Sequence, residues 1–592
     1  MRITNPNEIA MLEMANAKSD KGYVQTTITA SFQKVTLAAE GEEGMTRAKW
    51  LALIALGIGY TTAFQQGACI GAIVKSIDEA LGPTTYYNWM LSASTITSTI
   101  SLPLAGGLSD IFGRRVFIIA GGFISLLAAV IALAAGNVPT MIASAAVAGL
   151  GSGSQQLALA AVSELVPNKM RGRVQACLDL LILPWSVFGA LTGGAMVVYH
   201  GKHGFRINFI IGVILNAVSI GAAWIWYHPP SQGAKLGNRT KMQAFKDLDW
   251  TGVGLMNTGI ILMLVAIGIG GTTVPWTTPG LLALVAVSIM SLLSFWLWEA
   301  KFAKNPFMAR ELFAGKARTF TAFLLIDFVA GMGLYAAAAF WAQLVRGLWQ
   351  GDPIKVGILC IPGGIGGAIG GFAAGMLIGK GKLFKTQYCL IYGTLIKTIA
   401  DFLITLIQPT GPYSIPFGMG IGFLSMLGTG WITVALIVCV QLSCSDENLG
   451  LATLLLGAVR AIGGSVAVTI YTSLLNNTLT KQAGPTIGKA VVPLGYPESG
   501  LRKLIFELTN ENIEAAAGLP GVTPDILAAA RQGLRETWTV GFHRVYFCAA
   551  SFAAVAFVVA LFTRDVSGNM TGHVAVRLEN ERPAAGDVES KR

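Results

Sequence analysis

The sequence predicts an all-α protein that crosses a membrane many times, and three observations support this prediction. Hydrophobic residues fill 53% of the 592 positions and charged residues only 12%, about half of the charged share of soluble domains. Apolar runs recur at about 20 residues, the length that a helix needs to cross the hydrocarbon core. Lys and Arg gather in alternate breaks between these runs. The composition excludes a largely disordered chain, and the net charge of +11 is too dilute for a nucleic-acid-binding face.

The apolar runs, taken in order, predict fourteen membrane helices. The first six are expected near 50–74, 86–108, 116–135, 139–162, 175–199 and 206–228. Two more follow near 251–270 and 280–299, and the last six near 319–345, 355–379, 387–407, 415–440, 449–475 and 545–563. Gly136, Asn137 and Pro139 supply the only break between the third and fourth runs.

These helices divide the chain into two bundles of six, separated by a two-helix insertion. The expected parts are an N-terminal tail (1–48), a first bundle (49–228), the insertion (229–318), a second bundle (319–563) and a C-terminal tail (564–592). The N-terminal tail lacks the short apolar core of a signal peptide. The polar C-terminal tail is expected to be mobile.

Within the second bundle, residues 476–543 are predicted to form a long loop outside the membrane. The loop is broken by four prolines: Pro485, Pro493, Pro497 and Pro520. One helical stretch is expected at Ile526–Arg535, and a segment of this length is expected to fold as a cap over the outer face. Asn476 opens a glycosylation sequon close to the membrane.

The charges of the loops orient the chain with both termini in the cytoplasm. Seventeen Lys and Arg lie in the loops, from Arg114 to Lys385, that are predicted to be cytoplasmic, against five in the short loops of the other side. A miscounted helix would reverse every later loop, so the asymmetry also supports the number of helices. The plasma membrane is the expected location, with a vacuolar or vesicular membrane as the alternative.

The strongest local motif is GLSDIFGRR, which follows the second predicted helix. Gly107 and Gly113 permit a tight turn and close approach of helices. Asp110 is suited to meet the positive end of a neighbouring helix or an Arg. Arg114 and Arg115 are suited to anchor the loop at lipid headgroups.

Three weaker motifs follow. A second copy of the first motif retains two glycines and one cation after the tenth helix: Gly375, Gly381 and Lys382, with Ile378 in the place of Asp110. The second weaker motif, Glu164 with Arg171, lies in the cytoplasmic loop after the fourth helix. The third is Gly193 with Gly194, in the run GALTGG of the fifth helix.

Together these motifs resemble those of the major facilitator superfamily, and GALTGG resembles a motif of its drug-antiporter branch. The resemblance implies two repeated six-helix bundles that rock about a central cavity, with GLSDIFGRR stabilising one end state. Fourteen helices, the long loop before the last helix and RAIGG from Arg460 resemble one fungal branch, which holds trichothecene efflux pumps and siderophore-iron transporters. Two departures stand out: Ala190 replaces a usual Pro, and 143–153 lacks the membrane Arg that antiporters use in proton coupling.

The resemblance implies a secondary transporter rather than an enzyme, with no cofactor and no resident metal. The expected activity is export of a hydrophobic metabolite or toxin in exchange for protons. Import of a siderophore–iron complex is the alternative, and a ligand sensor that does not transport is a third reading. The chain carries no GxxxxGK[ST] motif for ATP and no nucleophile–base pattern. His200 and His203 alone are weak evidence for a metal, and the seven cysteines show no CxxC spacing.

Charged residues within the predicted helices are candidates for coupling, because each costs about 2.5–3.5 kcal/mol to insert. Asp179 lies near the inner end of the fifth helix, and Asp327 near the middle of the ninth, which by the repeat should line the cavity. Lys397 and Asp401 are four residues apart and can neutralise each other on one helix face. Arg460, in the thirteenth helix, is expected to pair with a carboxylate or to contact an acidic ligand. A structural ion pair or hydrogen bond is the alternative role.

Uncharged polar residues on the helices expected to line the cavity are the candidates for a substrate pocket. They are Gln65, Gln66, Gln155, Gln156, Tyr335, Thr429, Trp431 and Thr433. An apolar wall with a few amides and aromatic rings suits a bulky, mostly neutral organic molecule. Hydrogen bonding from one helix to another is the alternative for each of them.

Overall fold

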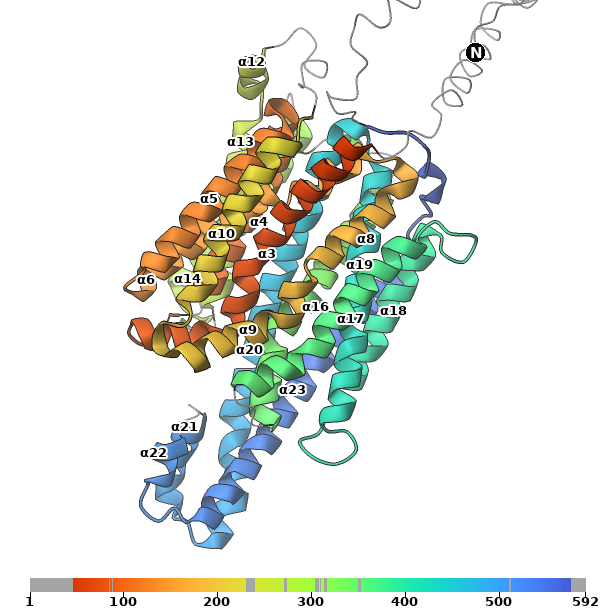
Figure 1. The fold of residues 1–592 in the computed structure, drawn as a ribbon. Coiled ribbons are helices and arrows are strands. Elements are labelled where there is room, and N and C mark those ends of the chain that lie inside the picture. Colours follow the sequence, from red (N-terminus) through yellow and green to blue (C-terminus); the bar gives the residue numbers. More distant parts are fainter. Residues whose placement is uncertain are drawn as a thin grey trace, which may run out of the picture.

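The computed structural model describes residues 46–575, apart from gaps at 85, 88, 230–239, 271–273, 304–307, 309, 314–316, 350–352 and 510–512. The described residues form two helical bundles side by side, one from each half of the chain (Figure 1). Their regular structure is helical apart from one isolated bridge between Gly270 and Val274, so the prediction of an all-α fold is confirmed. Most of the predicted N-terminal tail lies outside the described residues.

The first bundle holds the first six predicted spans. Its helices are α3 (Arg47–Leu81), α4 (Trp89–Phe112), α5 (Arg114–Ala134), α6 (Val138–Gln155), α7 (Ala158–Leu165), α8 (Arg171–Leu181), α9 (Leu183–His200) and α10 (Arg206–Trp226). The fourth and fifth spans are each split in two, which the sequence prediction missed. Both breaks are tightened turns, since the amides of Leu159 and Ile182 bond to carbonyls only three residues back. Pro184 lacks an amide hydrogen and so favours the second break.

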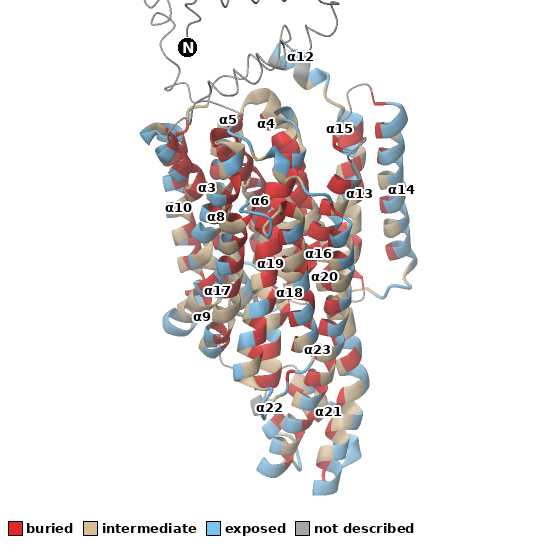
Figure 2. Ribbon diagram, turned by 90° about the vertical axis from the view of Figure 1, so that its right-hand side faces the viewer, coloured by how far each residue is buried: buried red, intermediate tan, exposed pale blue. Residues whose placement is uncertain are grey.

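The second bundle holds the last six predicted spans. Its helices are α16 (Ala317–Trp349), α17 (Pro353–Leu377), α18 (Thr386–Ile404), α19 (Ile415–Ser443), α20 (Leu449–Val491) and α23 (Pro524–Leu561). Between the bundles come α12 (Lys241–Lys246), α13 (Trp250–Ile269), α14 (Pro279–Lys301) and α15 (Arg310–Phe313). The inserted α14 stands at the edge of the molecule with much of its surface exposed (Figure 2). Helix α13 packs inward, where Val253 and Met256 share an apolar cluster with Leu451 of α20.

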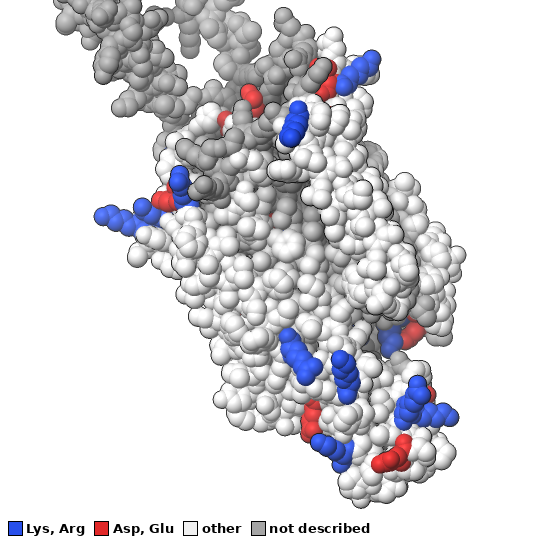
Figure 3. Space-filling view, turned by 180° about the vertical axis from the view of Figure 1, so that it is seen from behind, with Lys and Arg blue, Asp and Glu red and all other residues white. Residues whose placement is uncertain are grey.

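The surface of the helices is that of a membrane protein. Ten described helical segments are long and apolar enough to cross a membrane. The other four predicted spans correspond to α3, α4, α6 with α7, and α18, so the number fourteen stays a prediction. On the face drawn in Figure 3, charged side chains gather toward the two ends and leave a broad uncharged band between them.

The two bundles meet closely at the end that carries Asp110 and Arg114, which we call the motif end; the opposite end is the far end. At the motif end, a Cβ on Gly106 would lie 3.2 Å from the Cα of Leu451, so α4 and α20 touch through glycine. Gly172 of α8 and Gly375 of α17 meet in the same way. These two contacts join opposite bundles, and both would be lost if the motif end opened.

Glycines with positive φ support the predicted repeat of the first motif. Gly113 ends α4 with φ of 101°, and Gly381, its predicted counterpart after α17, has φ of 64°. Residues other than glycine rarely adopt these φ angles. A glycine with positive φ therefore stands at the predicted position in both halves of the chain.

The far end carries a helical hairpin instead of the predicted loop. Helix α20 continues through Pro485 to Val491, and α21 (Glu498–Thr509) and α22 (Ile513–Ala517) lead to α23, which includes the helical stretch predicted at Ile526–Arg535. The hairpin has its own core, with Ile487, Leu504 and Ala530 fully buried. This packing outweighs the one hydrogen bond that Pro485 removes. The segment projects beyond the bundles rather than capping them (Figure 1).

The sequon at Asn476 lies within α20 rather than in a loop. Thr478, its third residue, is 2% exposed and donates a hydrogen bond to the carbonyl of Leu474. Use of this site for a glycan stays a prediction.

Candidate functional site

The motif end carries a buried ionic network around Arg114. Its Nη2 lies 2.6 Å from Glu164 Oε1 and 3.1 Å from Asp110 Oδ1, so charges from α4, α5 and α7 meet. A Cβ on Gly450, in the first turn of α20, would come within 3.0 Å of both Asp110 and Arg114. The Asp110 carboxylate thus faces the positive end of α20, the contact that the sequence predicts. The network joins three helices of the first bundle to a helix of the second.

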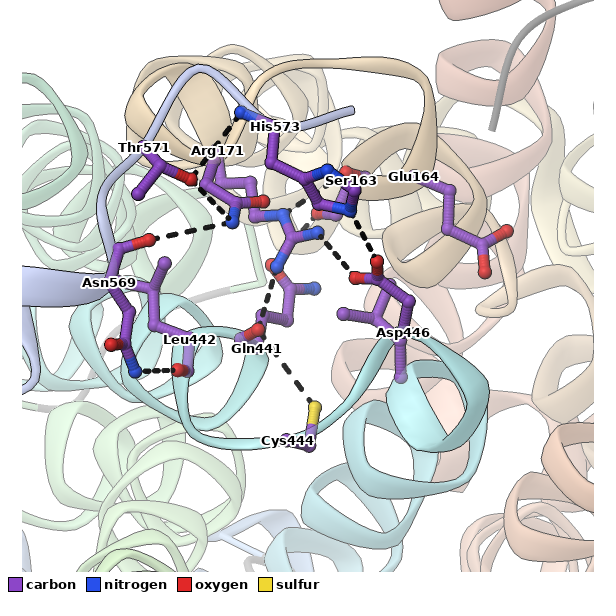
Figure 4. Close-up of polar contacts among 12 residues, drawn as sticks. Ser163, Glu164, Arg171, Gln441, Leu442, Cys444, Asp446, Asn569, Thr571 and His573 are labelled. Atoms are coloured by element: carbon purple, nitrogen blue, oxygen red, sulfur yellow. Dashed lines mark hydrogen bonds and ion pairs between the residues drawn. The ribbon is translucent and has the colours of Figure 1, made fainter. Parts of the chain in front are cut away.

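Arg171 makes a second connection between the bundles at the motif end. Its Nη1 donates to the carbonyl of Gln441 at 2.7 Å, and its Nε donates to the carbonyl of Ser163 at 3.2 Å (Figure 4). Its Nη2 lies 3.5 Å from Asp446 Oδ1. Ser163 also donates its hydroxyl to the side chain of Gln441 at 2.8 Å. Because Ser163 and Arg171 belong to the first bundle and Gln441 to the second, these bonds close the motif end.

The other motif residues pack within the first bundle. Arg115 donates to the carbonyl of Trp224 at 2.6 Å and lies over its indole ring, 5.6 Å from the ring centroid. A Cβ on Gly193 would lie 2.8 Å from the carbonyl oxygen of Cys69, so α9 and α3 approach closely there. Gly194 is buried in the same helix.

A buried ion pair lies deep in the second bundle, between α16 and α20. Arg460 donates to Asp327 Oδ1 from Nε at 2.9 Å and from Nη2 at 2.7 Å. Asp327 is fully buried. Its other oxygen, Oδ2, is buried without a hydrogen-bond partner among the described residues. Arg460 therefore pairs with a carboxylate, as expected, and that carboxylate is Asp327. Both bonds reach the same one of its two oxygens.

Polar groups of both bundles surround this pair. Asp179 on α8 and Tyr60 on α3 lie within electrostatic range of Arg460, as does Tyr335 on α16. The Asp179 carboxylate occupies the space that a Cβ on Gly371 of α17 would take. Asp179 forms no ion pair or hydrogen bond through its side chain with any described residue. Arg460 thus binds Asp327 of its own bundle. A second carboxylate, Asp179 of the opposite bundle, lies within electrostatic range and forms no ion pair with a described residue.

Lys397 and Asp401 neutralise each other, as their spacing predicts. Lys397 Nζ lies 2.8 Å from Asp401 Oδ2, and Asp401 Oδ1 accepts a hydrogen bond from Ser425 of α19. The two residues are 4% and 2% exposed. The stem of Lys397 fills the space beside Gly333 of α16. The pair therefore links three helices inside the second bundle, away from the first.

Two predicted pocket residues bond within the first bundle. Gln65 donates to Asn208 Oδ1 at 2.6 Å. Gln155 donates to Asn216 Oδ1 at 2.9 Å and accepts from the hydroxyl of Ser125 at 3.1 Å. These are bonds between neighbouring helices, the alternative role that the sequence left open for both glutamines. Gln66 lies beside them, against Gly212 of α10.

In the second bundle, two more candidates bond locally. Thr429 donates to the carbonyl of Ser425, and Trp431 Nε1 donates to the carbonyl of Cys389 at 2.8 Å. Thr433 lies on the same helix and is 9% exposed.

Two of the predicted pocket residues lie at the junction between the bundles. Gln156 reaches toward Gly457 of α20, and the ring of Tyr335 lies against Gly464 of the same helix. Both are partly exposed.

Four neighbours of the candidates were not singled out from the sequence. Asn208, Asn216 and Gln441 form hydrogen bonds with candidates, and Tyr60 lies within electrostatic range of Arg460. Each is a polar side chain in an apolar run, and that signal was available. Their partners depend on which helix faces which, and this cannot be read from one run alone.

The comparisons with known proteins agree with this arrangement. A family model described as fungal trichothecene efflux pump matches residues 52–591. The chain belongs to this family. It is 26% identical over 548 residues to the trichothecene efflux pump TRI12 of Trichoderma arundinaceum, covering 89% of this chain and 87% of that one. It is 25% identical over 563 residues to the multidrug transporter MdtP of Bacillus subtilis, covering 93% and 99%.

Solved structures support the same fold. The human organic anion transporter MFSD10 matches with a TM-score of 0.53 at 12% identity, over 87% of this chain and all of that one. A bacterial homologue of the human lysosomal transporter Spinster matches with a TM-score of 0.50 at 16% identity, over 88% and 98%. The protein is a membrane efflux transporter of the major facilitator type. Neither of these two curated relatives is named as a siderophore transporter.

We predict that Asp110→Ala lowers the turnover of the transporter several-fold while leaving its expression intact. The substitution removes the carboxylate that faces the start of α20, whereas Arg114 keeps its bond to Glu164. The initial rate of efflux per molecule in membrane vesicles measures the effect. Asp525→Asn, at an exposed carboxylate of the far-end hairpin, is the matched control. Normal turnover of Asp110→Ala would leave the motif with a role in topology only.

We predict that Asp401→Ala destabilises the protein by about 3–5 kcal/mol, because it leaves the charge of Lys397 buried without its partner. Thermal unfolding in detergent measures the change. The double variant Lys397→Met, Asp401→Leu removes both charges and should recover most of the lost stability. An Asp401→Ala protein as stable as the wild type would mean that Lys397 finds another partner.

Proposed function

We propose that the protein exports a hydrophobic secondary metabolite in exchange for protons, and that Asp327 carries the proton. The motif end faces the cytoplasm in this proposal, and the plasma membrane is its location. The proposal rests on one observation: among the described residues, only one of the two carboxylate oxygens of Asp327 accepts hydrogen bonds.

A proton can bind Asp327 where the carboxylate is unused. The Nε and Nη2 atoms of Arg460 both donate to Oδ1, and Oδ2 is buried without a partner among the described residues. A proton on Oδ2 removes the negative charge of Asp327, so its ion pair with Arg460 is replaced by weaker hydrogen bonds from a cation to a neutral acid. Uptake of one proton thus frees the guanidinium without moving a helix.

The freed Arg460 has a second carboxylate within electrostatic range. Asp179 belongs to α8 of the first bundle, whereas Asp327 and Arg460 both belong to the second. Protonation of Asp327 therefore shifts the attraction of Arg460 from its own bundle to the opposite one. That shift changes the energy of the junction between the bundles, which is what coupling a proton to rocking requires.

The substrate class follows from the residues at the junction. Gln156 and Tyr335 offer one amide and one phenol in a largely apolar setting, together with the charge of Arg460. Such a surface suits a bulky organic molecule with a few oxygen acceptors. A relative from Trichoderma arundinaceum is named a trichothecene efflux pump, so sesquiterpenoid toxins are the first class to test.

Asp327→Asn is expected to abolish uphill transport and to leave ligand binding within about twofold of the wild type. The amide keeps the shape of the side chain but cannot take up the proton. Substrate accumulation against its gradient in inside-out vesicles, driven by an imposed pH difference, is the measurement, with equilibrium binding of the same substrate beside it. Asp525→Asn again serves as the control. Unchanged uphill transport by Asp327→Asn would exclude this residue as the proton carrier.

Export itself can be tested in yeast that lacks its own toxin pumps and siderophore carriers. Cells that express the protein should hold less sesquiterpenoid or polyketide toxin than cells with an empty vector, and the difference should vanish when the proton gradient is dissipated. A second panel of iron-loaded siderophores tests the opposite direction. Higher siderophore content with unchanged toxin content would overturn the proposal in favour of iron uptake.

A further inference from the structure

The chain after α23 does not leave the protein at once, contrary to the mobile tail that the sequence predicts. Residues Asp565–His573, which we call the strap, run across the motif end and touch both bundles (Figure 4). Sequence patterns do not reveal this segment, because the strap is short and polar and its partners are loop carbonyls and amides. Its two apolar side chains, Val566 and Met570, pack against the main core, and Met570 lies beside Gly379 of the second bundle. The contacts of the strap with the first bundle are hydrogen bonds.

The strap is anchored to the second bundle. Asp565 accepts a hydrogen bond from Thr386 at 2.8 Å and lies 3.5 Å from Lys385 Nζ. The amide of Val566 donates to the hydroxyl of Thr386 at 2.8 Å. Although burial acts to raise it, hydrogen bonds from Ser567, Thr386 and Lys385 hold the pKa of Asp565 below its usual value. The anchor therefore stays charged and bound at neutral pH.

The strap also bonds to the end of α19 and to the loop that follows it in the same bundle. Asn569 Nδ2 donates to the carbonyl of Leu442 at 2.7 Å. His573 Nε2 lies 2.6 Å from Asp446 Oδ2, and the other oxygen of Asp446 lies 3.5 Å from Arg171 of the first bundle. In Figure 4 the His573 ring and the Arg171 guanidinium point toward the same carboxylate.

The last part of the strap pairs with the main chain of the first bundle. The amide of Lys169 donates to the carbonyl of Thr571, and the amide of Asn168 donates to the carbonyl of His573, both at 3.0 Å. The Asn168 side chain adds a weaker bond of 3.4 Å to the hydroxyl of Thr571. Thus one continuous segment is fixed to the second bundle at its start and to the first bundle at its end.

We propose that the strap is a clasp that holds the motif end shut and sets the rate at which this end opens. Residues 168–169 and the Leu442–Asp446 segment lie in opposite bundles, so rocking must separate them. The bonds to Asn168 and Lys169 break in that step, whereas the anchor at Thr386 moves with α18 and can persist. The proposal rests on the alternating access proposed above, but it needs neither the assigned substrate nor the proton carrier.

Two truncations isolate the clasp. A chain that ends after Ser567 keeps the anchor and loses the bonds to the first bundle, whereas a chain that ends after Ala575 keeps the whole strap and serves as the matched control. The reporter is Leu454→Cys in a background without the seven native cysteines. Leu454 is 1% exposed and faces Gly106 across the α4–α20 contact. Its thiol becomes accessible only when the two helices part.

Labelling of this cysteine by a small membrane-permeant maleimide should be about tenfold faster after truncation at Ser567, the factor expected from losing one or two net hydrogen bonds. The control truncated after Ala575 should label at the full-length rate. Equal labelling of all three chains would overturn the clasp. The double variant Asn569→Ala, His573→Ala in the full-length chain should raise the labelling rate several-fold. It provides the test if the chain truncated after Ser567 fails to fold.

A cross-link tests the same clasp in the opposite sense. Asn168→Cys with Thr571→Cys should form a disulfide that slows maleimide labelling at position 454 to the limit of detection, and a reductant should restore it. Asn168→Cys alone is the control. A cross-linked protein that labels at the normal rate would show that the motif end opens without releasing the strap. These readouts follow opening rather than transport, so loss of the export function in the yeast assay would leave their outcome interpretable.

Discussion

A charge buried in a membrane protein has to be paired, and the buried cations of this transporter show how that constraint organises the structure. Arg114 meets Glu164 and Asp110, Arg171 meets Asp446, Lys397 meets Asp401 and Arg460 meets Asp327. Removing one partner of such a pair leaves a cost of several kcal/mol. A helix that carries one of these residues therefore cannot move freely, since each movement must keep the pair together or supply a replacement.

The pairs differ in which helices they bind together. Lys397–Asp401 and Arg460–Asp327 lie within the second bundle, which they hold as a unit. The Arg114 network and Arg171 lie where the bundles meet, beside the glycine contacts of Gly106 and Gly375. The molecule thus combines rigid bundles with a junction whose polar contacts are concentrated at one end. Two rigid bodies with a separable junction are what the rocking of a major facilitator transporter needs.

The sequence predicted those parts that depend on neighbours along the chain. The helical spans follow from apolar runs, the turn at Gly113 from glycine, and the Lys397–Asp401 pair from a spacing of four. It also predicted that Asp110 would meet a helix end or an Arg, and Asp110 meets both. For Arg460 it left open a carboxylate partner or an acidic ligand, and the structure supplies the carboxylate. The sequence did not identify Asp327 as that partner, because the choice depends on how α16 faces α20. For Gln65 and Gln155 the sequence left open a pocket or a bond between helices for the same reason: a single helix does not reveal which of its faces turns inward.

Helix α20 runs without a break from Leu449 to Val491. At 1.5 Å per residue its 43 residues span about 65 Å, roughly twice the thickness of the hydrocarbon core. Its first turn touches Asp110, its second quarter holds Arg460, and its last turns form one wall of the far-end hairpin. One helix therefore passes from the closed end of the transporter, past the Arg460–Asp327 pair, to the hairpin that projects beyond the bundles (Figure 1). An antibody or inhibitor that binds the hairpin therefore binds the same helix that carries Arg460. It can act on the movement of this helix from a distance, without competing with a substrate.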